Sequence, residues 1–139
     1  MSEARNTQVV KDAYAAFGRS DVNGILALLD DSIVWEGVKG TEGVMRTAGV
    51  RKGRPAVGEF FSQVDATIAF DSFEPRDYVA QGDAVVAIGR YSGRSKETGR
   101  SFSSDWVMVF EFSAGKIARF REFSDSAALV GAFKVMAKV

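Results

Sequence analysis

From residue 66 to residue 124 apolar and polar residues alternate with a period of two, and this pattern predicts a β-sheet. Four extended segments are expected, at roughly 67–79, 84–92, 101–112 and 116–124. The short connections QGD at 81–83 and SAG at 113–115 predict tight hairpins, so that neighbouring strands run antiparallel. Pro75 places the middle of the first long strand at an edge or a bulge of the sheet.

The first part of the chain carries a helical period instead. Apolar residues at three- and four-residue spacing predict a helix that ends at Gly18, because glycine commonly terminates helices. Ser20 or Asp21 can cap a second, short helix, whose apolar face comprises Val22, Ile25, Leu26 and Leu29. Two consecutive helices are therefore expected before the first strand.

One strand and two further helices complete the expected elements. The stretch SIVWEG at 32–37 predicts a strand with Ile33 and Trp35 on the same side. Pro55 is well placed to begin a third helix, whose apolar face comprises Val57, Phe60, Phe61 and Val64. Residues 127–136 predict a short terminal helix.

The segment 37–53 holds five glycines and shows no clear period. A connection of this length inside one domain is uncommon and is often functional. Two interpretations stay open, a lid over a cavity or a floppy hairpin.

With 139 residues the chain fits one domain, residues 1–139, with one sizeable core. Helices followed by a meander of strands predict an α+β fold. In this fold three N-terminal helices and a short C-terminal helix pack against a curved, cone-like mixed or antiparallel sheet. A strongly bent sheet covered by helices leaves a hollow between the layers, and a small ligand is expected there.

The balance of charge excludes several kinds of partner. Eighteen Lys and Arg balance eighteen Asp and Glu, so the chain has no excess of positive charge to attract nucleic acid or anionic lipid. The N-terminal stretch MSEARNTQVV shows no signal pattern, and no apolar run approaches the about 20 residues that span a bilayer. We therefore expect no nucleic-acid partner, no membrane partner and a cytoplasmic location.

Cysteine and histidine are both absent. Their absence excludes disulfides, thiolate chemistry and every Ser-His or His-metal arrangement. Proton transfer at neutral pH would then need an Asp, Glu, Lys or Tyr side chain whose pKa its surroundings have shifted. No dinucleotide or phosphate-loop motif occurs, so no cofactor and no metal site is assigned.

Several stretches together resemble one known family. They are YAAFGRSDVNGILALLDDSIVWEG, GRPAVGEFF, GDAVVAIGRYSGR, TGRSF and SAGKIARFREFSDSAAL, and they run in order through nearly the whole chain. This pattern is similar to the SnoaL-like branch of the NTF2-like superfamily, which includes ketosteroid isomerases and polyketide cyclases. The resemblance is specific for the fold, and this fold hosts enzymes, binding proteins and transport factors alike.

The resemblance implies a cone-shaped pocket and a homodimer formed through the outer face of the sheet. The strand FSSDWVMVFEF at 102–112 agrees with a dimer, because apolar side chains occupy both of its faces. A single-layer sheet that faced water would need only one apolar face.

The catalytic positions of the ketosteroid isomerases transfer only in part. Their aspartate base aligns with Glu36, which keeps a carboxylate. Their oxyanion-hole tyrosine aligns near Ala13, one position before Tyr14, and their protonated aspartate aligns with Met108. Many SnoaL-like sequences carry histidine at the Met108 position, whereas methionine cannot transfer a proton but packs against flat apolar ligands. Steroid isomerisation by the same mechanism is therefore not expected.

Two carboxylates in FREFSD at 120–125 are further catalytic candidates. The family register places Phe120 on the pocket side, and Glu122 shares its face, where burial would raise the pKa. Alternatively, Glu122 pairs with an arginine or stays hydrated at the pocket rim. Asp125 has the opposite parity, and it either caps the last helix or acts as the late-strand base of SnoaL-like cyclases.

The expected ligand-binding residues are Tyr14, Trp35, Phe60, Trp106, Met108 and Phe120. The two tryptophans either wall the pocket or fill the core. The sequence thus predicts a protein that binds a small hydrophobic molecule. It would act either as a cofactor-free isomerase, cyclase, dehydratase or hydrolase that uses carboxylate chemistry, or as a non-catalytic binding or assembly module.

Overall fold

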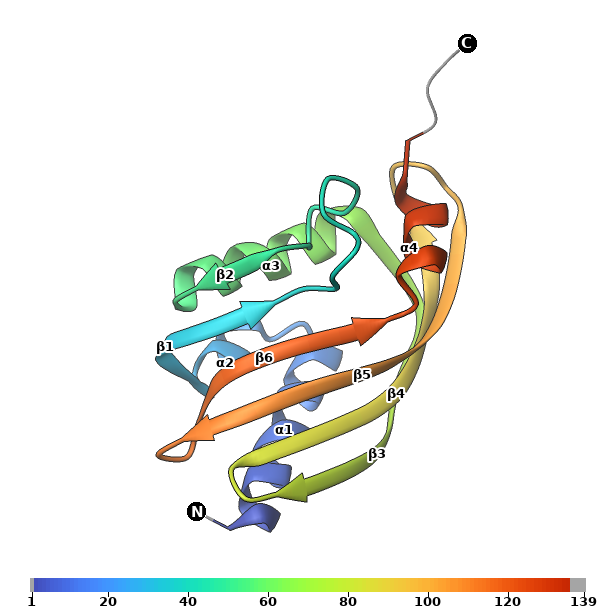
Figure 1. Ribbon diagram of the computed structural model, residues 1–139. Coiled ribbons are helices and arrows are strands. Elements are labelled where there is room, and N and C mark those ends of the chain that lie inside the picture. Colours follow the sequence, from blue (N-terminus) through green and yellow to red (C-terminus); the bar gives the residue numbers. More distant parts are fainter. Residues whose placement is uncertain (1, 136–139) are drawn as a thin grey trace.

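The computed structural model describes residues 2–135, and its strands form one six-stranded sheet in the order β2-β1-β6-β5-β4-β3 (Figure 1). The strands are β1 (Leu29–Glu36), β2 (Val50–Lys52), β3 (Ile68–Gln81), β4 (Ala84–Ser95), β5 (Ser101–Ser113) and β6 (Lys116–Ser124). Strands β3 to β6 form the predicted antiparallel meander. Strand β1 pairs with β6 in parallel and with β2 antiparallel, so the sheet is mixed.

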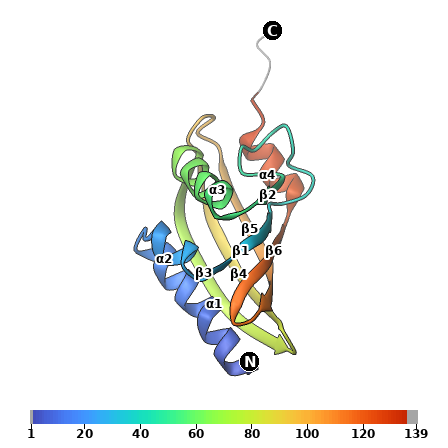
Figure 2. The ribbon, with the colours of Figure 1, turned by 90° about the vertical axis from the view of Figure 1, so that its left-hand side faces the viewer.

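Three helices cover one face of this sheet, as the turned view shows (Figure 2). They are α1 (Glu3–Gly18), α2 (Val22–Leu26) and α3 (Arg54–Thr67). The last helix, α4 (Ser126–Phe133), follows β6 and packs against β5 and β4. The predicted α+β architecture, a curved sheet with three N-terminal helices and one short C-terminal helix, is confirmed.

The helix ends follow local capping chemistry. Of the two predicted caps of α2, Asp21 takes the role, because its Oδ1 accepts a hydrogen bond of 2.9 Å from the Gly24 backbone N–H. Helix α3 begins at Arg54, one residue before the predicted Pro55. Helix α4 ends at Phe133, and the predicted end at Met136 lies outside the described residues.

One expectation about the elements is wrong. Leu29 does not extend the second helix but begins β1, where its side chain is fully buried. The spacing of Leu29 from Ile25 and Leu26 fits a helix, but its spacing from Ile33 and Trp35 also fits the buried side of a strand. The strand β2 inside the segment 37–53 was not expected, since three residues of alternating exposure are too few to show a period, but its antiparallel pairing with β1 agrees with the hairpin interpretation of this segment.

Strand β3 curves the edge of the sheet. It is the terminal strand in the sheet order, and its register shifts between Phe70 and Ser72 and again between Pro75 and Asp77. Such irregularities bend a strand and increase its twist. Both predictions for Pro75, an edge strand and a bulge, are therefore confirmed.

The concave face of the sheet is densely aromatic. Trp106 on β5 is only 1% exposed and lies against the backbone of Gly89 on β4. A Cβ atom at Gly89 would lie 2.3 Å from Cζ2 of the Trp106 ring. The absence of a side chain at Gly89 thus lets the indole lie flat on the neighbouring strand.

Candidate functional site

A cavity of about 90 Å³ lies between the concave face of the sheet and the helices. Its walls come from α1, α2, α3, α4, the loop after β1 and all of the long strands. Most of the lining is aliphatic or aromatic, and the lining residues with a hydroxyl or carboxyl group are Tyr14, Thr47, Tyr91 and Glu122. The cavity is therefore an apolar chamber with a few polar groups.

An open groove runs over the surface between the end of α1, α2, α3 and the first half of β3. It shares eight lining residues with the cavity, among them Phe17, Phe61 and Phe73. Its rim carries polar side chains such as Asp21 and Asp65. The shared residues show that the groove adjoins the cavity.

Glu122 belongs to a small hydrogen-bonded cluster in the cavity wall. The Tyr91 hydroxyl donates to Glu122 Oε2 over 2.8 Å, and the Ser124 hydroxyl donates to the same oxygen over 3.3 Å. The hydroxyls of Tyr91 and Ser124 lie 2.6 Å apart. Because each carries one hydrogen, a hydroxyl that donates to the other one does not donate to Oε2 at the same time. The second carboxylate oxygen, Oε1, accepts no hydrogen bond from residues 2–135 and is available to a ligand.

The environment of Glu122 shifts its ionisation. Burial raises its pKa above the ordinary value of 4.5, while the hydrogen bonds from Tyr91 and Ser124 act in the opposite direction. Glu122 keeps some accessible surface because it borders the cavity, yet apolar side chains replace most of the water around it. Burial and the nearby carboxylate also raise the pKa of Tyr91, so its hydroxyl stays a donor.

Tyr14 brings a second hydroxyl to the cavity from α1. Its hydroxyl donates to Met108 Sδ on β5 over 3.0 Å. Burial is the largest cause that raises the Tyr14 pKa, and Tyr78 and Glu122 add to it. Thioether sulfur is a weak acceptor, so an oxygen atom of a ligand would be a better partner for this hydroxyl.

Aromatic rings line the cavity beside Glu122, since Phe120 lies two residues before it on the same face of β6. The Trp35 and Phe120 rings are stacked, with centroids 3.8 Å apart and planes inclined by 19°. The Phe60 ring lies 5.4 Å from that of Trp35, and all three residues line the cavity. Trp106 does not line it, because the Tyr14 and Phe73 rings pack over the indole at 5.6 and 5.3 Å.

Glu36 lies away from this cluster. It neighbours Trp35 on β1 and therefore points to the other face of the sheet. Its carboxylate forms an ion pair with Lys39 at 3.4 Å and does not line the cavity. The structure does not bring Glu36 and Glu122 together.

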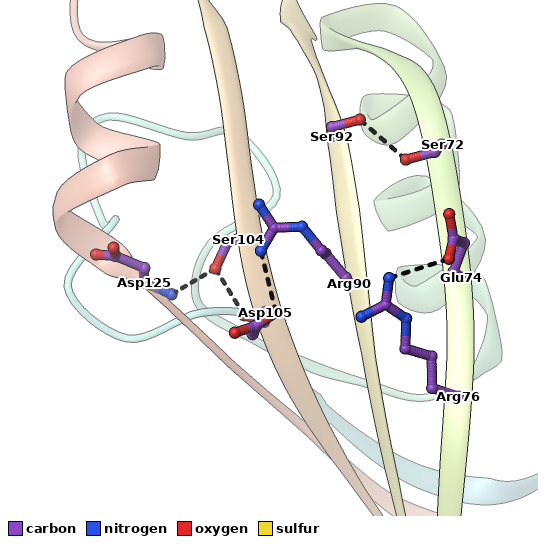
Figure 3. A network of polar contacts seen from close by, with 8 residues as sticks. All are labelled: Ser72, Glu74, Arg76, Arg90, Ser92, Ser104, Asp105 and Asp125. Atoms are coloured by element: carbon purple, nitrogen blue, oxygen red, sulfur yellow. Dashed lines mark hydrogen bonds and ion pairs between the residues drawn. The ribbon is translucent and has the colours of Figure 1, made fainter.

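Asp125 occupies the N-cap of α4. Its Oδ1 accepts a hydrogen bond of 3.1 Å from the Ala128 backbone N–H. Its own backbone N–H donates to Ser104 Oγ over 2.9 Å (Figure 3). Of the two acids in FREFSD, Glu122 thus faces the cavity, and Asp125 holds the start of a helix.

Tyr91 is the residue of this cluster that the sequence analysis did not single out. In AVVAIGRY it has the parity of Val85 and Ala87, which are buried under the helices. This alternation was a usable signal that the tyrosine faces inward. Its distance from Glu122 along the chain hid the contact, because only the pairing of β4, β5 and β6 brings the two together.

The loop after β1 covers part of the cavity. Val38, Met45 and Thr47 contribute to the lining. The guanidinium of Arg51 on β2 donates to the backbone carbonyls of Arg46, Thr47 and Ala48 at 2.8 to 3.3 Å. These hydrogen bonds fasten the loop to the sheet.

Residues 2–135 contain no group of three or more Asp, Glu, His or Cys side chains arranged to hold a metal ion. None of the helices in this part of the chain has the length and apolar character that crossing a membrane requires.

Solved structures with the same fold are numerous. An NTF2-like protein from Burkholderia xenovorans LB400 is 34% identical, with a TM-score of 0.86, over 96% of this chain and 99% of that one. An NTF2-like protein of unknown function from Burkholderia pseudomallei K96243 is 26% identical, with a TM-score of 0.86, over 97% and 100% of the two chains. TerC, co-crystallised with polyporic acid, is 24% identical with a TM-score of 0.82, over 93% and 98%, and shows the fold alone.

Among curated proteins none matches the chain significantly. The model of the SnoaL-like domain matches residues 10–120, which include α2, α3 and β1 to β5 in full. Together with the NTF2-like structural relatives, this match shows that the chain belongs to the SnoaL-like family of the NTF2-like superfamily.

Proposed function

We propose that the protein binds a small, ring-containing hydrophobic molecule in the aromatic cavity and that Glu122 is the acid or base of a cofactor-free reaction. The observation that carries this proposal is a carboxylate with a raised pKa and one unpaired oxygen in an apolar chamber. A shifted carboxylate in such a chamber is typical of acid-base catalysis. Isomerisation, cyclisation and dehydration are reactions that need only such proton transfers.

The residues around Glu122 would have different roles in the reaction. Tyr91 and Ser124 hold Oε2 and thereby orient the carboxylate. Oε1 would take a proton from the ligand or return one to it. The Tyr14 hydroxyl would leave the sulfur of Met108 and donate to an oxygen of the ligand. Trp35 and Phe120 would pack against the ring of the ligand.

A second candidate function is non-catalytic binding in the same cavity. Proton abstraction next to a carbonyl needs a base and also a stabiliser for the oxyanion. The lining offers Glu122, but the hydroxyls of Tyr14 and Tyr91 are bonded to different partners and do not form a matched pair of donors. This observation favours a binding module over an isomerase of the steroid type.

One experiment separates these functions. Small ring compounds are screened by thermal shift, because a ligand at 100 times its dissociation constant adds about 2.7 kcal/mol to the stability. Compounds that bind are then incubated with the wild type and with Glu122→Gln. We expect both proteins to bind and only the wild type to convert the compound.

Each other outcome is informative. Binding without conversion by the wild type would support the binding module. A wild type that no ring compound stabilises would contradict ligand binding in the cavity. Conversion that persists unchanged in Glu122→Gln would remove Glu122 from the chemistry.

We also propose that two copies associate through the outer face of the sheet. An apolar patch crosses this face and comprises Val79, Val86, Ile88, Val107, Val109 and Phe123. Val79, Ile88 and Phe123 are 58%, 38% and 42% exposed. Ion pairs such as Arg90–Asp105 at 3.1 Å and Arg76–Glu74 at 3.2 Å lie beside it (Figure 3). Apolar area bordered by charge is typical of an association surface.

A further inference from the structure

The charges around the cavity are unbalanced. Glu122 is the single charged residue among those of the described chain that line it, and the lining includes no Lys or Arg. The neighbouring basic residues on β6, Arg119 and Arg121, approach Glu111 at 3.6 and 3.8 Å and do not line the cavity. A buried carboxyl group either pairs with a cation or keeps its proton, because an unpaired charge in apolar surroundings is costly. When Glu122 is ionised, the residues that line the cavity supply no counter-charge to it.

The aromatic walls also favour a positively charged ligand, as an ionised Glu122 would. The faces of Tyr, Trp and Phe rings carry partial negative charge and attract cations. Trp35, Phe73, Tyr91 and Phe120 all line the cavity. Both the ring faces and the carboxylate would repel an anionic ligand.

The carboxylate is already oriented to receive a donor. Tyr91 and Ser124 both contact Oε2 and offset a part of the rise in pKa that burial causes, while Oε1 has no hydrogen-bond partner among residues 2–135. The titratable groups that face Glu122 are Tyr91 from β4 and Tyr14 from α1, and both stay neutral because burial raises their pKa. Met108 on β5, Leu129 on α4 and the cavity-facing loop residues bring no further charge.

We infer that the cavity takes a small hydrophobic amine in its ammonium form, with an N–H donated to Glu122 Oε1 and its ring against the wall of Trp35 and Phe120. The inference rests on the proposed function for the place of the ligand and adds its chemical class. Alkyl amines are protonated at neutral pH, as the Lys side chain is with its pKa of about 10.4. A cavity of about 90 Å³ has room for about three water molecules at about 30 Å³ each and is smaller than an apolar cavity of about 150 Å³ that binds benzene. A single-ring amine would therefore also occupy part of the adjoining groove, which shares eight lining residues with the cavity.

The test uses three probes of one shape and different charge, namely benzylamine, benzyl alcohol and benzoate. Their dissociation constants are measured by calorimetry with the wild type, Glu122→Gln and Glu59→Gln. Glu59 is an exposed acid on α3, so its variant makes the same chemical change away from the cavity. We expect the wild type and Glu59→Gln to bind benzylamine about tenfold more tightly than benzyl alcohol, with benzoate weakest. In Glu122→Gln this preference should vanish while benzyl alcohol still binds.

The acidity of the solution gives a second readout. Benzylamine needs the ionised carboxylate, so its affinity for the wild type should rise with pH as Glu122 loses its proton. The affinity of benzyl alcohol should not follow this rise. Calorimetry in buffers of different ionisation enthalpy should show a proton released when benzylamine binds at acidic pH.

The outcomes distinguish this inference from the proposed function. If benzyl alcohol binds at least as tightly as benzylamine, or if the preference survives in Glu122→Gln, the ammonium class is overturned and the proposed function stands. If none of the three probes binds, both are overturned for ligands of this size. If Glu122→Gln does not fold, Tyr91→Phe replaces it. This variant keeps the carboxylate but removes a donor that favours its ionised form. The pH at which the affinity for benzylamine rises should therefore be higher in Tyr91→Phe than in the wild type. An unchanged pH would contradict the inference.

Discussion

At Glu122, burial and hydrogen bonding act on one pKa in opposite directions. Burial is the larger influence and raises it, while the donors Tyr91 and Ser124 offset a part of the shift. A folded-state pKa above the unfolded value means that the folded protein holds the Glu122 proton to higher pH than the unfolded chain does. This carboxylate therefore links stability to pH.

Replacing Glu122 with Gln should flatten the pH dependence of the free energy of unfolding. Below about pH 4.5 the carboxyl group is protonated in both states, and the full contribution of Glu122 to stability is present. As the pH rises through the higher folded-state pKa, the unfolded chain ionises first and the wild type loses stability. The difference in stability between wild type and variant should thus shift against the wild type as pH increases. Urea unfolding at a series of pH values measures it.

The exposed acid Glu59 provides the control. Its replacement by Gln removes one carboxylate from the surface of α3, so the pH dependence should stay close to that of the wild type. A wild type and a Glu122→Gln variant whose stabilities run parallel between pH 4 and 8 would contradict the raised pKa.

The alternation of side chains along a strand predicted which face of the sheet each residue occupies, but it did not predict the contacts between strands. The alternation in β6 correctly placed Glu122 on the face of Phe120, since a strand dictates which side each residue faces. The hydrogen bond from Tyr91 depends on how three strands are aligned with one another. No pattern within one strand contains that alignment.

The same difference appears among the strands. The hairpins of the meander could be predicted because each turn and its two strands are adjacent in the sequence. The parallel pairing of β1 with β6 and the short strand β2 could not, because they join distant or very short segments. Leu29 was assigned to a helix because its spacing fits both periods.

Helix α4 is held in place by the connection between β4 and β5. The Arg100 guanidinium donates to the carbonyl of Gly131 over 2.9 Å and also to that of Lys134. The Thr98 hydroxyl donates to the carbonyl of Ala132 over 2.5 Å. These carbonyls lie at the C-terminal end of the helix, where no further turn supplies donors. Since Leu129 lines the cavity, the connection also holds one wall of the chamber.

Replacing Arg100 with Met should loosen α4 while it preserves most of the apolar stem. Hydrogen bonds to charged donors contribute about 1.5–3 kcal/mol, and solvent exposure of this arginine places the expected loss at the lower end. Hydrogen exchange of the amides in 126–134 should accelerate more than that of the amides in β3 to β6. Native-state exchange followed by mass spectrometry measures both.

Arg94→Met is the matched control, since within the described part of the chain Arg94 forms an exposed ion pair with Asp71 at 3.7 Å and no other polar side-chain contact. Exposed pairs of this kind contribute little, about 0–1 kcal/mol. If exchange in α4 is as slow in Arg100→Met as in Arg94→Met, the connection does not secure the helix.

The outer face of the sheet bears on the assembly of the protein. Ile88, Val107 and Phe123 are register neighbours on three adjacent strands and form one apolar row. Replacing Ile88 with Arg should convert a dimer to a monomer, because a desolvated charge would lie at the centre of the interface. Analytical ultracentrifugation over a range of concentrations measures the change.

Val50→Arg serves as the comparison. Val50 is 55% exposed, but it lies on β2 at the far edge of the sheet from Ile88. This variant should remain dimeric. A monomeric wild type, or equal dissociation by both variants, would contradict association through this face.

The parallel pair of β1 and β6 also governs when the protein can acquire its shape during translation. Strand β1 leaves the ribosome long before β6 has been synthesised, and until then Trp35 has no Phe120 on which to stack. A nascent chain that ends before β6 therefore exposes aromatic surface, which is the condition in which chaperones bind and aggregation begins. The walls of the cavity are complete only after the ribosome has added β6 and α4, which supply Phe120, Glu122 and Leu129.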